Sequence, residues 1–380
     1  MLLRRSSRLL KTNYGLFSTV AEPKVKFDEF RTIENDPSKH TKDHEAKFYE
    51  IDSETKKKIF RYGGLTKSFE KQIKTFNEAC LMVRKPAIDI INYVKNTDFS
   101  KPVVRYVLYG ENGAGKTMTM AHLLHYGYVN EFLLVHVPWI PYWYKHPKEF
   151  GNSSIHEGFT DLPLEAAAWL LHFKTQNAEL LAKTGLRTTQ DYVWSKRETT
   201  PAGSTFLELV DHGINRAKFA SEVIKVLLDE IKQQSSDGKV KTMVVIDGFN
   251  SMFYEKTNLK GEFKVMIPTD KITLTKPFMD IAKHDWSNGV CILSVDKIAM
   301  LGFERESHHP IYLLGREGFE HLDPFVPIKH ENYDEKEYES CIAYYVNRRW
   351  IQNTGEGFEK ELKFLTNSNP YKLMDFTKSL

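Results

Sequence analysis

Eight consecutive residues, 110–117, have the spacing of a phosphate-binding loop. They read GENGAGKT and match the pattern G-x-x-x-x-G-K-[ST]. The glycines let the backbone turn its N–H groups inward without a Cβ in the way, and a following helix adds partial positive charge at its N-terminus. In this pattern Lys116 reaches the β- and γ-phosphates of a nucleotide, and the Thr117 hydroxyl binds Mg²⁺. The predicted nucleotide contacts are Gly110, Glu111, Asn112, Gly113, Ala114, Gly115, Lys116, Thr117 and Met118.

A second candidate for the metal site is Asp247, which follows four apolar residues, 243–246. An acid that ends a buried parallel strand lies next to the phosphate-binding loop in a doubly wound sheet, so we predict that Asp247 and Thr117 together hold magnesium. ATPases of the AAA+ type commonly place Glu after this Asp to orient the attacking water, whereas here Gly248 and Phe249 follow. Without such a base, assistance of roughly 10²–10⁴ is missing, and Asn250 would polarise a water only weakly. We expect nucleotide binding with slow or no turnover.

Five apolar runs predict the strands that position these residues, at 103–109, 132–137, 243–247, 289–296 and 325–328. The first leads directly into residues 110–117, and a helical pattern follows at once. Strand, glycine-rich turn and helix in this order predict an α/β fold of the P-loop NTPase type, with a parallel central sheet. Ser294 or Asp296, at the end of the fourth run, would lie near the γ-phosphate.

The segment before the first strand predicts contacts to the base of the nucleotide. Apolar residues recur at helical spacing from 69 to 83, Pro86 is expected to break this helix, and a second helix resumes over 88–94. Because such a pair of helices would lie beside the base, Met82 and Arg84 are candidates for base contacts, with core packing as the alternative for Met82.

We divide the chain into four parts. Residues 1–20 are a presequence and 21–62 an extended arm that needs a partner to order it. Residues 63–330 form the nucleotide-binding domain, with a helical insertion at about 138–240 that contains a loop at 192–198. Residues 331–380 form a helical lid.

The bulk composition is that of a globular protein. The chain has 380 residues, of which 41% are hydrophobic, and no apolar run approaches the roughly 20 residues that span a membrane. The first 20 residues are rich in arginine and serine and free of acids, which is typical of a mitochondrial presequence and predicts the mitochondrial matrix. Its cleavage would remove four basic residues and change the net charge from +3 to −1, so any nucleic-acid contact must come from local patches.

Several segments together resemble one family. They are NEACLMVRKP at 77–86, YVW at 192–194 with KRE at 196–198, GF at 318–319, LDPF at 322–325, PI at 327–328, ESCI at 339–342 and FL at 364–365. Their order and spacing resemble the death-associated GTP-binding proteins of the small subunit of the mitochondrial ribosome. The resemblance implies an AAA-like fold with a C-terminal lid, and a guanine nucleotide with Mg²⁺. It also implies a place in the head of the small subunit, in contact with small-subunit rRNA, neighbouring mitoribosomal proteins and the large subunit. The lack of a long apolar run predicts no membrane partner.

The base of the nucleotide stays open on physical grounds. The [NT]-K-x-D motif by which Ras-like GTPases read guanine has no counterpart near residues 294–297. We therefore expect GTP or GDP with Mg²⁺ and do not exclude ATP. The predicted function is a structural ribosomal subunit that holds this nucleotide as a structural ligand. The alternative is an active AAA-type NTPase, acting as a remodeller or a signalling switch, which would need a catalytic acid and an arginine from a neighbour.

Overall fold

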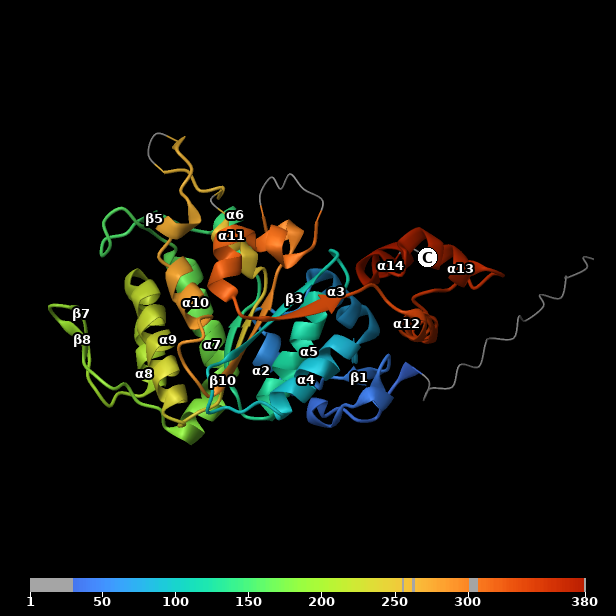
Figure 1. The fold of residues 1–380 in the computed structure, drawn as a ribbon, viewed down its shortest axis with the longest axis horizontal. Coiled ribbons are helices and arrows are strands. Elements are labelled where there is room, and N and C mark those ends of the chain that lie inside the picture. The colour runs from blue at the N-terminus through green and yellow to red at the C-terminus, as the bar shows by residue number, and fades with distance from the viewer. Residues whose placement is uncertain (1–29, 255, 262–263, 301–306, 379–380) are drawn as a thin grey trace, which may run out of the picture.

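A computed structural model describes residues 30–254, 256–261, 264–300 and 307–378 (Figure 1). The predicted presequence lies outside these residues. The helices are α2 Ser53–Phe60, α3 Lys67–Phe76, α4 Lys85–Lys95, α5 Lys116–Val129, α6 Pro141–Lys145, α7 Pro163–Thr184, α8 Phe206–Asn215, α9 Ala220–Ser236, α10 Thr275–Ile281, α11 Pro310–Leu322, α12 Glu335–Asn347, α13 Phe358–Thr366 and α14 Pro370–Thr377. The strands are β1 Phe48–Glu50, β2 Cys80–Met82, β3 Val104–Gly110, β4 Leu133–Val137, β5 Gly151–Asn152, β6 Thr160–Asp161, β7 Tyr192–Ser195, β8 Glu198–Thr200, β9 Thr242–Ile246, β10 Gly289–Ser294 and β11 Val326–His330.

The centre of the molecule is a five-stranded sheet in the order β11-β3-β10-β9-β4, and all four pairings are parallel. The five strands are those that the apolar runs predict, which confirms an α/β fold with a central parallel sheet. Because the strands are parallel, their carboxyl ends meet at one edge. The ends of β3, β10 and β9 are neighbours there, and the residues with candidate chemistry follow them.

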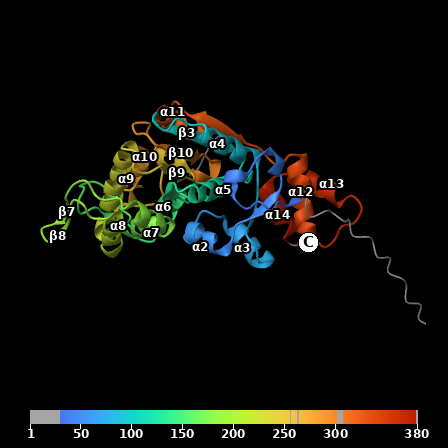
Figure 2. The same cartoon turned by 90° about the horizontal axis from the view of Figure 1, so that it is seen from below.

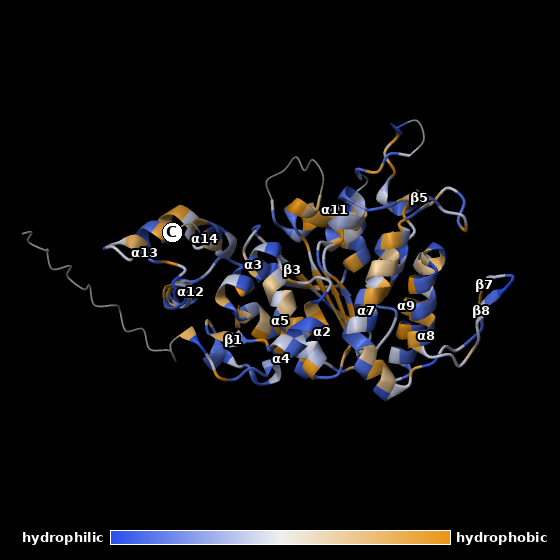
Figure 3. Cartoon of the chain, turned by 180° about the vertical axis from the view of Figure 1, so that it is seen from behind, coloured by the Kyte–Doolittle hydropathy of each residue, from blue (hydrophilic) through white to orange (hydrophobic). Residues whose placement is uncertain are grey.

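Helices cover both faces of this sheet, which explains why its inner strands read as continuous apolar runs. One buried cluster joins the sheet to α7, α8, α9 and α10, and a second joins the other face to α2, α4 and α5. Figure 3 shows the apolar strands between α5 and α7. The residues predicted as a helical insertion therefore supply one of the two layers over the sheet.

The structure revises the prediction for residues 192–198, which form the antiparallel hairpin β7–β8 instead of a loop. Its strands are short, and their pairing is irregular between Val193 and Ser195. The hairpin lies at the opposite end of the molecule from α12–α14 (Figure 2).

A third buried cluster joins the C-terminal helices to the start of the chain. Tyr344 of α12 packs against Phe30 and stacks on Phe48 of β1, with ring centroids 4.3 Å apart in the second pair. β1 in turn pairs with β2 in antiparallel register. Residues 30–62 are therefore folded onto the domain within this chain, which corrects the prediction of an extended arm that needs a partner. Phe30 and Phe48 lie far from Tyr344 in the chain, and only the fold brings these partners together.

The segment before β3 also differs from its prediction. α3 ends at Phe76, where Asn77 adopts a left-handed conformation, and β2 follows before α4 begins. Pro86 lies in the first turn of α4, where its missing N–H has no cost. It therefore starts the second helix and does not break the first. None of the described helices is both long and apolar enough to cross a membrane.

A buried group of histidines holds the N-terminal segment against α5. His40 is hydrogen-bonded to His122 at 2.9 Å, and Nδ1 of His125 lies 3.3 Å from the Tyr49 hydroxyl. Burial lowers the pKa of His40, lowers that of His122 well below its usual value and lowers that of His125 to about 4. The carbonyl of Glu34 partly offsets the shift at His40.

We expect acid to loosen the contact of residues 37–50 with α5. A histidine whose pKa is depressed in the folded state adds stability above its unfolded pKa of about 6.5, and this stability is lost as the pH falls toward the folded value. For His125 alone the loss at pH 5 is about 2 kcal/mol. Hydrogen exchange at pH 7.5 and 5.0, corrected for intrinsic rates, measures it. In His125→Asn, whose side chain does not titrate, protection of residues 37–50 should change less between the two pH values. Equal protection of wild type at both pH values would contradict a role for these histidines in the acid response.

Candidate nucleotide-binding site

The backbone of residues 110–117 turns tightly between β3 and α5. Gly110, Gly113 and Gly115 have φ angles of 147°, 81° and 104°, which strain any residue with a Cβ. At Gly110 a Cβ would lie 2.0 Å from the carbonyl oxygen of His330, so a side chain does not fit. Within the described residues, the first N–H groups of α5, those of Lys116 and Thr117, have no backbone acceptor. They remain available to an anion at the N-terminus of the helix.

The structure brings the two predicted magnesium ligands together. The Thr117 hydroxyl donates a hydrogen bond of 2.7 Å to one carboxylate oxygen of Asp247, and the Ser294 hydroxyl donates to the other. Burial raises the pKa of Asp247 to about 6, and the charge of Asp296 adds to this, while the two hydroxyl donors and Lys116 oppose it. A divalent cation would restore the ionised carboxylate at this buried position.

Lys116 points back into its own loop. Its ammonium forms an ion pair of 2.8 Å with Asp296 and donates to the carbonyls of Gly110 and Glu111 at 3.0 and 2.9 Å. Asp296 therefore lies beside the loop, at the end of β10, where the sequence placed it. It contacts the lysine that this motif directs to phosphates.

The residues after Asp247 make structural contacts. The Asn250 amide donates to the carbonyl of Asp296 at 2.9 Å and accepts from its N–H at 3.0 Å, so both ends of the side-chain amide are engaged with the backbone. Gly248 has a φ angle of 75°, and a Cβ there would lie 2.8 Å from Cδ of Pro141. The position that carries the catalytic Glu in AAA+ ATPases cannot accept a side chain here without a shift of its neighbours.

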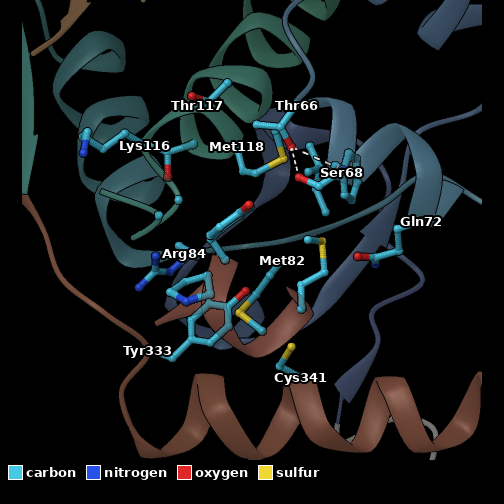
Figure 4. A pocket seen from close by; sticks show the side chains of 18 of the residues that line it. Thr66, Ser68, Gln72, Met82, Arg84, Lys116, Thr117, Met118, Tyr333 and Cys341 are labelled. Carbon is cyan, nitrogen blue, oxygen red and sulfur yellow. Dashed lines mark hydrogen bonds between the residues drawn. The ribbon is translucent and has the colours of Figure 1, made fainter. Parts of the chain in front are cut away.

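A cavity of about 420 Å³ adjoins the loop. Its walls come from α3, β2, the loop itself, α12 and α14 (Figure 4). Met82 and Met118 both line it, together with Tyr333 and Cys341. Met82 therefore lies in the cavity beside the loop, and its contact with a base stays a prediction. Mostly apolar and aromatic walls with a few polar groups are typical of pockets that bind small ligands.

Arg84 also lines the cavity, but its guanidinium is engaged with protein groups. Two of its nitrogens donate to the carboxylate of Glu337 at 2.8 and 2.7 Å, and a third donates to the carbonyl of Ala114 at 2.6 Å. Burial alone lowers the pKa of Arg84, but hydrogen bonds and charge from Glu337 outweigh it and raise the pKa. We therefore revise the predicted role of Arg84 from base contact to a link between the loop and α12.

The residues present fit a magnesium nucleotide. Free N–H groups at the start of α5 and the Lys116 ammonium suit phosphates, and the oxygens of Thr117 and Asp247 suit a hard cation. Sequence analysis missed the supporting residues His330, Glu337 and Asn369. His330 lies 2.6 Å from the Thr119 hydroxyl, more than 200 residues apart in the chain. No local pattern marks such partners.

Replacing Glu337 by Gln should destabilise the protein by about 3 kcal/mol, because it leaves the buried Arg84 cation without its counterion. Gln still supplies the oxygen that caps the first turn of α12, so the loss reports on the charge. Glu335→Gln, on the same turn but exposed, is the matched control and should cost less than about 1 kcal/mol. Urea unfolding measures both, and equal stability of the two variants would contradict the importance of this pair.

Comparison with known proteins places the chain in a family. Residues 81–376 match the family described as mitochondrial ribosomal death-associated protein 3. The small ribosomal subunit protein mS29 of Bos taurus is 42% identical over 344 residues, covering 90% of this chain and 85% of that protein. The Mus musculus mS29 protein is 40% identical over 354 residues, covering 92% and 89%.

Among solved structures, the S. cerevisiae Hsp104-ADP complex aligns with 87% of this chain and 47% of that chain, at 12% identity and a TM-score of 0.33, which is too low to support a conclusion. The matches in sequence, in contrast, cover most of the chain and confirm the resemblance seen in its scattered segments. The chain belongs to the mitochondrial ribosomal death-associated protein 3 family.

Proposed function

We propose that this protein is a structural component of the small subunit of the mitochondrial ribosome and holds a purine nucleotide with Mg²⁺ as a structural ligand. Membership of the family supports the ribosomal role, and the mS29 relatives carry it in their names. It also establishes the mitochondrial localisation that the N-terminal composition predicts. Small-subunit rRNA, neighbouring mitoribosomal proteins and the large subunit are the partners that this role implies.

The observation that carries the nucleotide proposal is the contact between Thr117 and Asp247. It places a hydroxyl and a carboxylate 2.7 Å apart at the mouth of a glycine-rich loop that follows a central strand. In P-loop proteins this arrangement holds magnesium against the β- and γ-phosphates. Among the described residues no three His, Cys, Asp or Glu side chains form a metal site of their own. That suits Mg²⁺, which takes one or two protein oxygens and completes its shell with phosphate and water.

The base and ribose would occupy the cavity beside the loop, between Met82, Met118 and Tyr333. The proposed ligand is GTP or GDP, with ATP as the alternative. When bound, the magnesium ion neutralises phosphate charge. The chain itself would orient the phosphates through its backbone N–H groups and Lys116, while residues of α12 and α14 line the cavity beside them.

Slow or absent hydrolysis follows from the residues around Asp247. Attack on a phosphate needs a group that orients water, and Gly248 leaves no room for one while Asn250 is engaged with the backbone. A ligand that is retained stabilises the folded state by RT ln(1 + [L]/Kd), about 4 kcal/mol at a concentration of 1,000 Kd. A retained nucleotide therefore suits a structural protein better than a motor. A measured turnover of at least ~1 s⁻¹ would favour the NTPase alternative.

Lys116→Ala should release the nucleotide and lower the thermal stability of the protein. Mass spectrometry of the small molecules released on denaturation identifies the base and the number of phosphates in wild type. Since Lys116→Ala also leaves Asp296 without its partner, Thr117→Val serves as a second variant that removes the proposed magnesium ligand and keeps the ion pair.

Lys101→Ala, at an exposed position outside the site, is the control and should retain the nucleotide. Wild-type protein that contains no nucleotide and binds none of the Mg²⁺ complexes of GDP, GTP or ATP would overturn the proposal. Variants that keep normal stability without nucleotide would show that the ligand is not structural.

A further inference from the structure

Three successive carbonyls of the phosphate-binding loop accept hydrogen bonds from outside the loop. The Asn369 side-chain amide donates to the carbonyl of Asn112 at 3.1 Å, and the Tyr371 N–H donates to that of Gly113, also at 3.1 Å. Arg84 donates to the carbonyl of Ala114 at 2.6 Å. Two of these three donors belong to the start of α14, in the C-terminal lid.

These contacts fix which way the loop presents its N–H groups. In a trans peptide the carbonyl and the next N–H point in opposite directions. Holding the carbonyls of Asn112 and Ala114 toward the lid and Arg84 therefore turns the N–H groups of Gly113 and Gly115 away from them. Within the described residues neither N–H has a backbone acceptor. They are free for the phosphates, which this loop binds through its backbone.

Gly113 shows how closely the loop and the lid fit each other. Residue 113 is a variable position of the motif, yet glycine is required here. In the structure a Cβ on Gly113 would lie 2.7 Å from Oδ1 of Asn369 and 2.7 Å from Cβ of Tyr371. Its φ angle of 81° adds to the requirement. The start of α14 thus occupies the space that a side chain on the loop would need.

We propose that Asn369 and the N–H of Tyr371 are positioning groups that hold the phosphate-binding loop in its binding conformation, so that docking of the lid and binding of nucleotide favour each other. The inference rests on the proposed function. Asn369 is suited to this role because it is buried and all its polar atoms are used. Its amide also donates to Oδ1 of Asn332 at 2.9 Å, and its oxygen caps α14 by accepting from the Lys372 N–H at 3.2 Å.

The coupling must act in both directions. If lid contacts preorganise the loop, less free energy is spent on ordering it when the nucleotide binds. By linkage, bound nucleotide then favours the docked lid by the same factor. α12 takes part through Glu337, which holds the third donor, Arg84. The state of the nucleotide site is thereby transmitted to the helices at one end of the molecule.

Asn369→Ser in the full-length protein tests the proposal. Serine keeps an oxygen that caps α14, but it is too short to reach the carbonyl of Asn112. The Kd for the Mg²⁺ complex of fluorescent N-methylanthraniloyl-GDP should rise roughly three- to tenfold, the factor that one hydrogen bond supplies. The control is Asn130→Ser, at the far end of α5, which also loses an amide-to-carbonyl bond but should leave this Kd unchanged.

Hydrogen exchange supplies a readout that a purely structural role would not move. Adding Mg²⁺ and N-methylanthraniloyl-GDP to wild type should slow exchange of the Tyr371 N–H and of the first turn of α14, and should do so less in Asn369→Ser. An unchanged Kd in Asn369→Ser, or no effect of nucleotide on α14 in wild type that binds it, would overturn the inference and leave the proposed function intact. Wild type that binds neither the GDP nor the ADP analogue would overturn the proposed function, and the positioning role with it.

Discussion

The conformation of a short stretch of backbone, residues 110–117, is the constraint on which the rest of the site depends. Its glycines adopt φ angles that other residues avoid, and three of its carbonyls are held by groups from the lid and by Arg84. Glycines at the turns are conformationally free and make no side-chain contacts that could fix the shape of the loop. Here the shape is imposed from outside, by contacts to elements that lie far away in the sequence.

These contacts exist because both ends of the chain pack together beside the sheet domain. The sheet, covered on both faces by helices, provides the rigid edge from which the loop, Asp247 and Asp296 project. The N-terminal segment and α12–α14 share a separate buried cluster at one end of the molecule. The cavity opens between this cluster and the sheet domain, so its walls come from both ends of the chain.

The electrostatics of the site support the proposal that it retains a ligand without turnover. Its cations, Lys116 and Arg84, are buried and paired with Asp296 and Glu337. Burying two charges costs desolvation free energy, and their attraction and hydrogen bonds offset this cost only when the geometry is good. Such pairs therefore hold the groups around them rigidly. A site that must cycle through conformations would need lower local stability than these contacts indicate. The lack of room at Gly248 points the same way, because a water-orienting acid would have to displace Pro141.

The sequence by itself determined the central sheet, the loop and the acid beside it. Apolar runs mark strands that are buried on both faces, and a motif of eight consecutive residues needs no partner to be recognised. Scattered segments of the sequence also pointed to the family, and the comparisons confirmed that the chain belongs to it. Arg84 and residues 30–62 were interpreted differently from what the fold shows, because a cation or an aromatic residue carries no mark of the distant group that it meets. Glu337 lies 253 residues from Arg84, and Asn369 lies 257 residues from Asn112. Only the tertiary structure decides such pairs, since they depend on which surfaces the packed helices bring together and not on any local pattern.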